Sequence, residues 1–144
     1  MKLEWQAITN VYKQVSITET ESGDEYRDGE GNIFTLDKDL VDAEIQRLEK
    51  VEQIKQSKIE RDKRLASIIY EREDGTRIQM RDPKFGSEYL IMSQLVTIMS
   101  EDDEQNWIDV DNKAILLTKS DMRKALSYQR KEISDIYDEY IKLL

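Results

Sequence analysis

A long helical segment, from about residue 39 into the middle 60s, is the feature that most constrains how this chain can fold. Apolar side chains recur along its first half, at Val41, Ile45, Leu48, Val51 and Ile54. Between Lys55 and Arg64 only Ile59 is apolar, so the second half offers almost nothing to a hydrophobic core. The sequence therefore predicts a solvated connecting helix between two modules. The predicted parts are an N-terminal β-rich module (1–37), the connecting helix (38–66) and a C-terminal α+β domain (67–144).

A coiled-coil seam is the alternative interpretation of this helix. Its apolar positions follow one another at a spacing near three residues, so they drift around the helix and do not hold a heptad. A charge-rich helix face is most often simply a hydrated one. We therefore favour the connecting spacer over the coiled coil.

The N-terminal module is predicted to be a β-hairpin. Residues 11 to 20 alternate between apolar and polar side chains, which is the pattern of a half-buried strand. Its apolar face carries Val11, Val15 and Ile17. Turn-forming residues follow at 22–25 and 28–32, and residues 33–36 form a short returning strand. Asp37 or Asp39 can then cap the long helix.

The segment from Asp28 to Asn32 also spaces oxygen ligands at every second residue, as the start of a calcium loop does. Ile33, however, occupies the position at which an EF-hand requires glycine, and Asp39 is a short substitute for the bidentate glutamate. The Asp109-x-Asp111 pair lacks the remaining ligands as well. We therefore predict turns at both places, with no metal site.

The C-terminal domain is predicted to have the order hairpin, helix, hairpin, helix. Residues 68–80 form two short strands around an Asp-Gly turn. Ser87 can cap a helix that continues to about Met99 and is apolar nearly all round, so we expect it to be the buried centre of this domain. Residues 107–117 form the second hairpin, in which Trp107 is more often a core anchor than a binding hot spot.

The last helix begins at a predicted capping box, in which the Thr118 hydroxyl and the Asp121 carboxylate satisfy backbone N–H groups. Its apolar positions alternate steps of four and three, at Met122, Leu126, Gln129, Ile133, Ile136, Tyr140 and Leu143. Such a stripe faces a core along one side of a helix. The fold class that follows is α+β.

The composition excludes several kinds of chemistry. There is no cysteine and no histidine, which removes thiolate zinc sites, cysteine nucleophiles and serine triads. The four acids Glu101–Glu104 have no evident burial that would separate their pKa values into an acid and a base. A net charge of −9 opposes binding to a phosphate backbone, and no apolar run approaches the length of a membrane helix. We expect a non-enzymatic protein without cofactors, nucleic acid or membrane as partners.

Three segments of the C-terminal part support a family resemblance: residues 70–75 (Tyr-Glu-Arg-Glu-Asp-Gly), 107–112 (Trp-Ile-Asp-Val-Asp-Asn) and 116–118 (Leu-Leu-Thr). With the helices between them, they resemble a domain of tailed-bacteriophage tail proteins that is often described as tail-fibre assembly. The resemblance covers roughly residues 60–144. It implies an accessory protein that acts in the host cytoplasm during assembly or remains in the virion tail. No catalytic residues are known for that family, so it implies none here.

The resemblance implies that the chain binds a tail-fibre or tail-tip protein, as an assembly chaperone or a minor structural component. Covering exposed strand edges or apolar surfaces of an immature fibre would prevent misassociation. The N-terminal module lies outside the resemblance and holds too few large apolar groups for a stable hairpin, so we place the partner surface there. The predicted partner-binding residues are Trp5, Ile8, Val11, Val15, Ile33 and Phe34.

Three alternatives remain at this point. The chain could regulate a host protein, which an acidic phage product can do. Less favoured is a carboxylate-based glycan hydrolase, because that chemistry requires paired acids in a cleft and the sequence shows no such pair. Self-association into a homo-oligomer also stays open.

Overall fold

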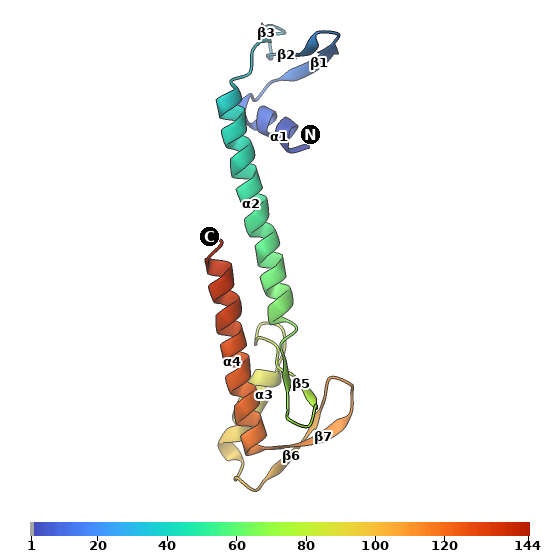
Figure 1. Cartoon of the computed structure of the whole chain (residues 1–144), viewed down its shortest axis with the longest axis vertical. Helices are drawn as coiled ribbons and strands as arrows, with labels where there is room; N and C mark the ends of the chain where they lie inside the picture. The colour runs from blue at the N-terminus through green and yellow to red at the C-terminus, as the bar shows by residue number, and fades with distance from the viewer. Residues whose placement is uncertain (1) are drawn as a thin grey trace. The chain divides into compact units, whose positions relative to one another are not determined.

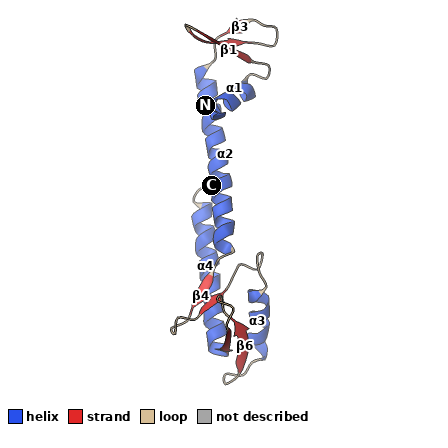
Figure 2. Cartoon of the chain, turned by 90° about the vertical axis from the view of Figure 1, so that its right-hand side faces the viewer, coloured by secondary structure: helices blue, strands red, loops and turns tan. Residues whose placement is uncertain are grey.

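The computed structural model describes residues 2 to 144 and has the predicted α+β architecture (Figures 1 and 2). The first elements are α1 (Lys2–Val11), β1 (Ser16–Thr20), β2 (Gly23–Arg27), β3 (Ile33–Phe34) and α2 (Lys38–Leu65). They are followed by β4 (Ile69–Glu71), β5 (Arg77–Gln79), α3 (Glu88–Ile98), β6 (Glu104–Ile108), β7 (Ala114–Thr118) and α4 (Lys119–Ile141). The chain forms two compact units, Met1–Lys55 and Gln56–Leu144, which divide inside α2.

The first unit combines helix α1, the start of α2 and an antiparallel sheet in the order β1-β2-β3. In the sheet, Tyr26 of β2 stands opposite Ile17 of β1 and opposite Phe34 of β3. The core is small: Ala7, Ile8 and Val41 are buried. Half-buried apolar side chains surround them, namely Tyr12, Val15, Tyr26, Leu36, Ile45 and Leu48.

The half-buried strand predicted over residues 11 to 20 is wrong in its first half. Val11 is the last residue of α1, because Ala7, Ile8 and Val11 recur at helical spacing and form one apolar face. Val15 packs against the core as irregular chain, before the strand begins at Ser16. The strand itself is exposed, with Ile17 at 42%.

Helix α2 confirms the predicted long helix, and Asp37 caps it. The Asp37 Oδ1 atom accepts hydrogen bonds from the backbone N–H groups of Asp39 (3.1 Å) and Leu40 (3.3 Å). The predicted solvated stretch is exposed from Lys55 to Glu60 except at Ser57, which is half-buried. The interpretation fails at the last turns of α2. There the Arg61 guanidinium lies 4.5 Å from the ring centroid of Tyr140 on α4. A long Arg side chain can cover apolar surface, which a count of apolar residues does not register.

The second unit contains both predicted hairpins, β4–β5 and β6–β7. Gly75 has φ +85° in the turn of the first, and Asn112 has φ 62° in the turn of the second. Trp107 is half-buried against the core, which agrees with the predicted core anchor. The buried core consists of Leu65, Ile68, Ile78, Met80, Met92, Met99, Leu117, Met122, Ala125 and Ile136.

Helix α3 has the predicted position, but it is not the buried centre of the unit. Within α3 only Met92 is fully buried, while Leu90 is 57% and Ile98 is 78% exposed. A helix that packs on one side exposes its other side whatever residues lie there, and α3 packs against α4. Ser87 occupies the N-cap position, but its side chain forms no capping hydrogen bond.

Helix α4 confirms the predicted capping box. The Thr118 Oγ1 atom accepts from the Asp121 N–H (3.1 Å), and the Asp121 carboxylate accepts from the Thr118 N–H (3.0 Å). The predicted stripe is buried at Met122, Gln129 and Ile136, and half-buried between them. The prediction of a buried stripe is wrong at the C-terminal end of the chain. There the apolar side chains are exposed, with Leu143 at 40%.

Candidate protein-binding surfaces

An open groove of about 670 Å³ lies in the first unit, between the end of α1 and the turn after β2. Its lining mixes aromatic, aliphatic and charged side chains: Val11, Tyr12, Lys13, Gln14, Asp28, Gly29, Glu30 and Phe34. Such a lining suits a peptide side chain better than a buried small molecule, because the groove is open to solvent and carries charge at its rim.

The aromatic wall of the groove is fixed in place by the start of α2. The Tyr12 ring packs on the Phe34 ring with centroids 4.9 Å apart. The Tyr12 hydroxyl oxygen accepts a hydrogen bond from the Asp37 N–H at 2.7 Å. Tyr12 therefore connects the end of α1 to β3 and to the start of α2.

The polar wall requires a glycine. A Cβ atom at Gly29 would lie 2.0 Å from the Gln14 Oε1 atom, so any larger residue would displace that side chain. The Asp28 Oδ1 atom accepts from the backbone N–H groups of Glu30 and Asn32, both at 2.9 Å, so this carboxylate closes the turn. No group of three or more potential metal-ligating side chains occurs in residues 2 to 144.

The six residues predicted to bind a partner are divided by the fold. Val11 and Phe34 line the groove together. Trp5 and Ile33 are exposed, at 40% and 57%. The other two, Ile8 and Val15, pack into the core of the first unit, and Ile8 is only 2% exposed. The assignment of Ile8 to a binding surface is therefore wrong, because the apolar face of α1 needs it.

Ile17 is an exposed apolar residue of this unit that the predicted binding set does not include. Ile17 is 42% exposed on β1, which is the outer strand of the sheet and pairs only with β2. The alternation of Ile17 with Thr18 and Thr20 did indicate a strand. It did not indicate that the strand would lie at an edge, because edge position depends on which strands pair.

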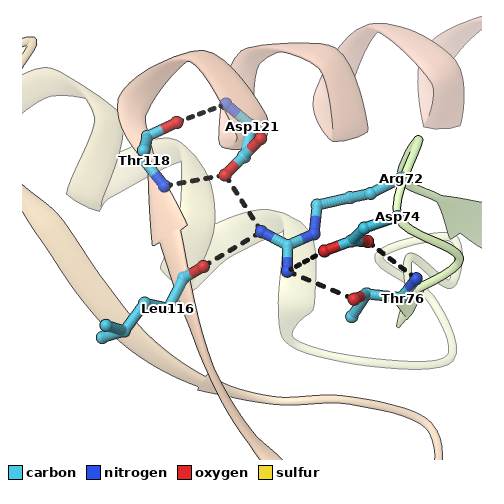
Figure 3. Close-up of polar contacts among 6 residues, drawn as sticks. All are labelled: Arg72, Asp74, Thr76, Leu116, Thr118 and Asp121. Carbon is cyan, nitrogen blue, oxygen red and sulfur yellow. Dashed lines mark hydrogen bonds and ion pairs between the residues drawn. The ribbon is translucent and has the colours of Figure 1, made fainter.

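In the second unit, Arg72 is the centre of a polar network (Figure 3). Its Nη1 atom donates to the Leu116 carbonyl oxygen (3.0 Å) and to the Asp121 carboxylate (3.2 Å). Its Nη2 atom donates to the Thr76 hydroxyl (3.2 Å) and lies 3.2 Å from the Asp74 carboxylate. One side chain from the first hairpin therefore holds the second hairpin and the start of α4.

This network changes the titration of its carboxylates. Burial raises the pKa of Asp121, but hydrogen bonds from Thr118 and the charge of Arg72 outweigh burial, so the net pKa is lowered. The pKa of Asp74 is lowered as well, chiefly by the hydrogen bonds from Thr76. Both acids are thus held in their charged form by structural contacts.

Exposed apolar side chains also occur on two elements of the second unit. Leu90, Ile91 and Ile98 lie on one side of α3 and are 57%, 46% and 78% exposed. Ile108 and Leu116 project from the outer face of the β6–β7 hairpin at 56% and 50%. Either group of exposed apolar side chains is a candidate for contact with another protein.

No family model, curated protein or solved structure matches the chain. In the described part of the chain, no helix is both long and apolar enough to cross a bilayer.

Proposed function

We propose that this chain is a non-enzymatic accessory protein of a phage tail, which binds a tail-fibre or tail-tip protein as an assembly factor or minor structural component. The phage context rests on the resemblance of residues 60–144. The binding role is supported by one observation: the first unit leaves Trp5, Ile17 and Ile33 in solvent on a small core. Side chains of this size bind partners best where they are exposed and rigidly held.

The test is co-expression of the full chain with the tail-fibre protein of the same phage, followed by purification through a tag on the fibre. We expect wild type to be retained. The double variant Trp5→Ala, Ile33→Ala should lose most of the retention, because it removes two exposed apolar side chains without touching the core.

Ile98→Ala is the matched control in the second unit, since Ile98 is exposed and its truncation leaves α3 packed. Loss of retention with Ile98→Ala alone would move the partner to α3. Failure of wild type to be retained would reject a tail-fibre partner, and repetition with the tail-tip protein would then decide the proposal.

A further inference from the structure

The outer edge of β1 is an unpaired strand edge. β1 pairs with β2 from Ser16 opposite Arg27 to Thr20 opposite Gly23, around a two-residue turn. In such a hairpin, the two residues that close the turn, here Thr20 and Gly23, exchange backbone hydrogen bonds. Every second residue of β1, counted back from Thr20, therefore bonds to β2 as well. Ile17 and Glu19 therefore direct their backbone N–H and C=O groups away from the sheet. Within residues 2 to 144, no other strand or side chain bonds to these groups.

In the hairpins of the second unit, three outward carbonyl groups already accept hydrogen bonds. The Arg77 carbonyl of β5 accepts from the Val110 N–H at 3.0 Å. The Leu116 carbonyl of β7 accepts from Arg72 at 3.0 Å, and the Asn106 carbonyl of β6 accepts from the neighbouring Gln105 side chain at 3.3 Å. A covered edge resists the addition of another strand, and an uncovered one templates it.

The free edge is also strongly acidic. Pairing places Ile17 opposite Tyr26 and Glu19 opposite Asp24, so these side chains share one face of the hairpin. Burial, and then the charges of Asp24 and Glu4, raise the pKa of Tyr26 on this face. The hairpin and the following turn carry acids at Glu19, Glu21, Asp24, Glu25, Asp28 and Glu30.

A single cation, Arg27, lies among these acids, and it is already engaged. Its guanidinium pairs with Glu25 (3.5 Å) and donates to the Gly31 carbonyl (3.0 Å). A second copy of the chain is a poor occupant, because pairing β1 with β1 would bring two acidic hairpins together in chains of net charge −9.

We infer that the β1 edge binds an extended basic segment of the partner as an added strand, with an apolar side chain beside Ile17 and Lys or Arg beside Glu19. Backbone hydrogen bonds supply affinity in this mode, and alternate side chains supply specificity. The inference rests on the proposed function, since it states how the tail protein would be held.

The probe is a blocked pentapeptide, Lys-Thr-Val-Thr-Lys, whose Val and Lys side chains lie on one face of a strand, as Ile17 and Glu19 do. It is titrated into the isotope-labelled full chain and followed by backbone amide NMR. We expect saturable shifts centred on the Ile17 and Glu19 amides, and little binding of the same peptide with Glu in place of Lys. Glu19→Pro removes an outward N–H group and a charge, so affinity should fall about tenfold or more. Glu19→Gln should give a smaller loss, because it removes the charge alone.

Asn106→Pro is the matched control, because Asn106 occupies an outward position on β6. It should leave peptide affinity unchanged. Shifts centred elsewhere, absence of saturable binding, or full affinity in Glu19→Pro would overturn the inference. So would a dimer of the chain that Glu19→Pro dissociates, since a second copy would then occupy the edge.

Co-expression with the tail-fibre protein separates this inference from the proposed function. Retention of wild type and loss of Glu19→Pro supports both. Equal retention of the two rejects the edge and keeps the function. Failure of wild type to be retained, with intact peptide binding at β1, rejects the fibre partner and keeps the edge as a site for basic strands.

Discussion

The two units of this chain differ in what their apolar residues and strand edges are used for. In the second unit, two hairpins and two helices share one core, and outward carbonyl groups accept hydrogen bonds from Arg72, Val110 and Gln105. In the first unit, Ala7, Ile8 and Val41 are the buried residues among those described, and β1 has a free edge. The difference teaches that stability and binding need not be built in the same place. A strand edge whose backbone groups are already bonded is hard to extend, while a free one can accept a strand.

The largest effect is expected from the core of the second unit. Ile136→Ala removes methyl groups from a side chain that is 3% exposed, and should lower the free energy of unfolding by about 2–5 kcal/mol. Urea denaturation followed by Trp107 fluorescence, in a Trp5→Phe background, measures it. Ile141→Ala, at 60% exposure on the same helix, should change it by less than about 0.5 kcal/mol. Equal effects of the two would contradict the core assigned to α4.

The Arg72 network should contribute less than the core. Arg72→Leu removes the Arg72 donor from the Leu116 carbonyl and one of the donors from the Asp121 carboxylate, which costs about 1–3 kcal/mol. Arg77→Leu, an exposed position on the same hairpin, is the control and should be nearly neutral. Calorimetric melting compares the two variants. If the two variants have the same melting temperature, the hydrogen bonds of Arg72 contribute nothing to stability. The contrast between the two units would then be weaker.

Acid should act on the same network. The lowered pKa of Asp121 means that its contribution to stability is fully present above its ordinary pKa of 3.8, and is lost as pH falls through the lower folded value. The stability difference between wild type and Asp121→Asn should therefore be constant above about pH 5 and close at lower pH. Denaturant midpoints across that range measure it. If the stability difference between wild type and Asp121→Asn persists at the lowest pH, it arises from side-chain packing and not from the charge of Asp121.

The smallest effect is expected in the first unit. Ile8→Val removes one methylene from its core and should cost about 0.5–1.5 kcal/mol. Hydrogen exchange of the α1 amides reports this unit separately, and Ile33→Val at an exposed position provides the comparison. A global loss of protection from Ile8→Val, as large as that from Ile136→Ala, would mean that the units unfold together and are not independent.

Local signals in the sequence predicted the elements whose chemistry is local. The Asp-Gly turn, the Thr118–Asp121 capping box and the long helix α2 are all present, because each depends on residues a few positions apart. Helix α1 was missed because Val11, Val15 and Ile17 fit a strand period while Ala7, Ile8 and Val11 fit a helical one. Competition between the two periods is decided by packing on Val41, which lies far along the chain.

The binding surface was harder to predict for a similar reason. Apolar character alone selected Trp5, Ile33 and Ile8 as binding candidates. The structure exposes Trp5 and Ile33 but buries Ile8. Whether an apolar residue faces a core or solvent depends on the other elements of the unit. The edge of β1 is a property of strand order, and the role of Arg72 arises from a residue 44 positions away. Neither feature can be predicted from one segment of the sequence alone.

The boundary between the units falls within a continuous helix, at Lys55 and Gln56 of α2. Domains are ordinarily separated by extended linkers, which proteases bind and cleave readily. A protease needs several residues of extended backbone, and here it must first melt turns of α2 to obtain them. In limited proteolysis the junction should therefore be cut later than the exposed turns of the chain.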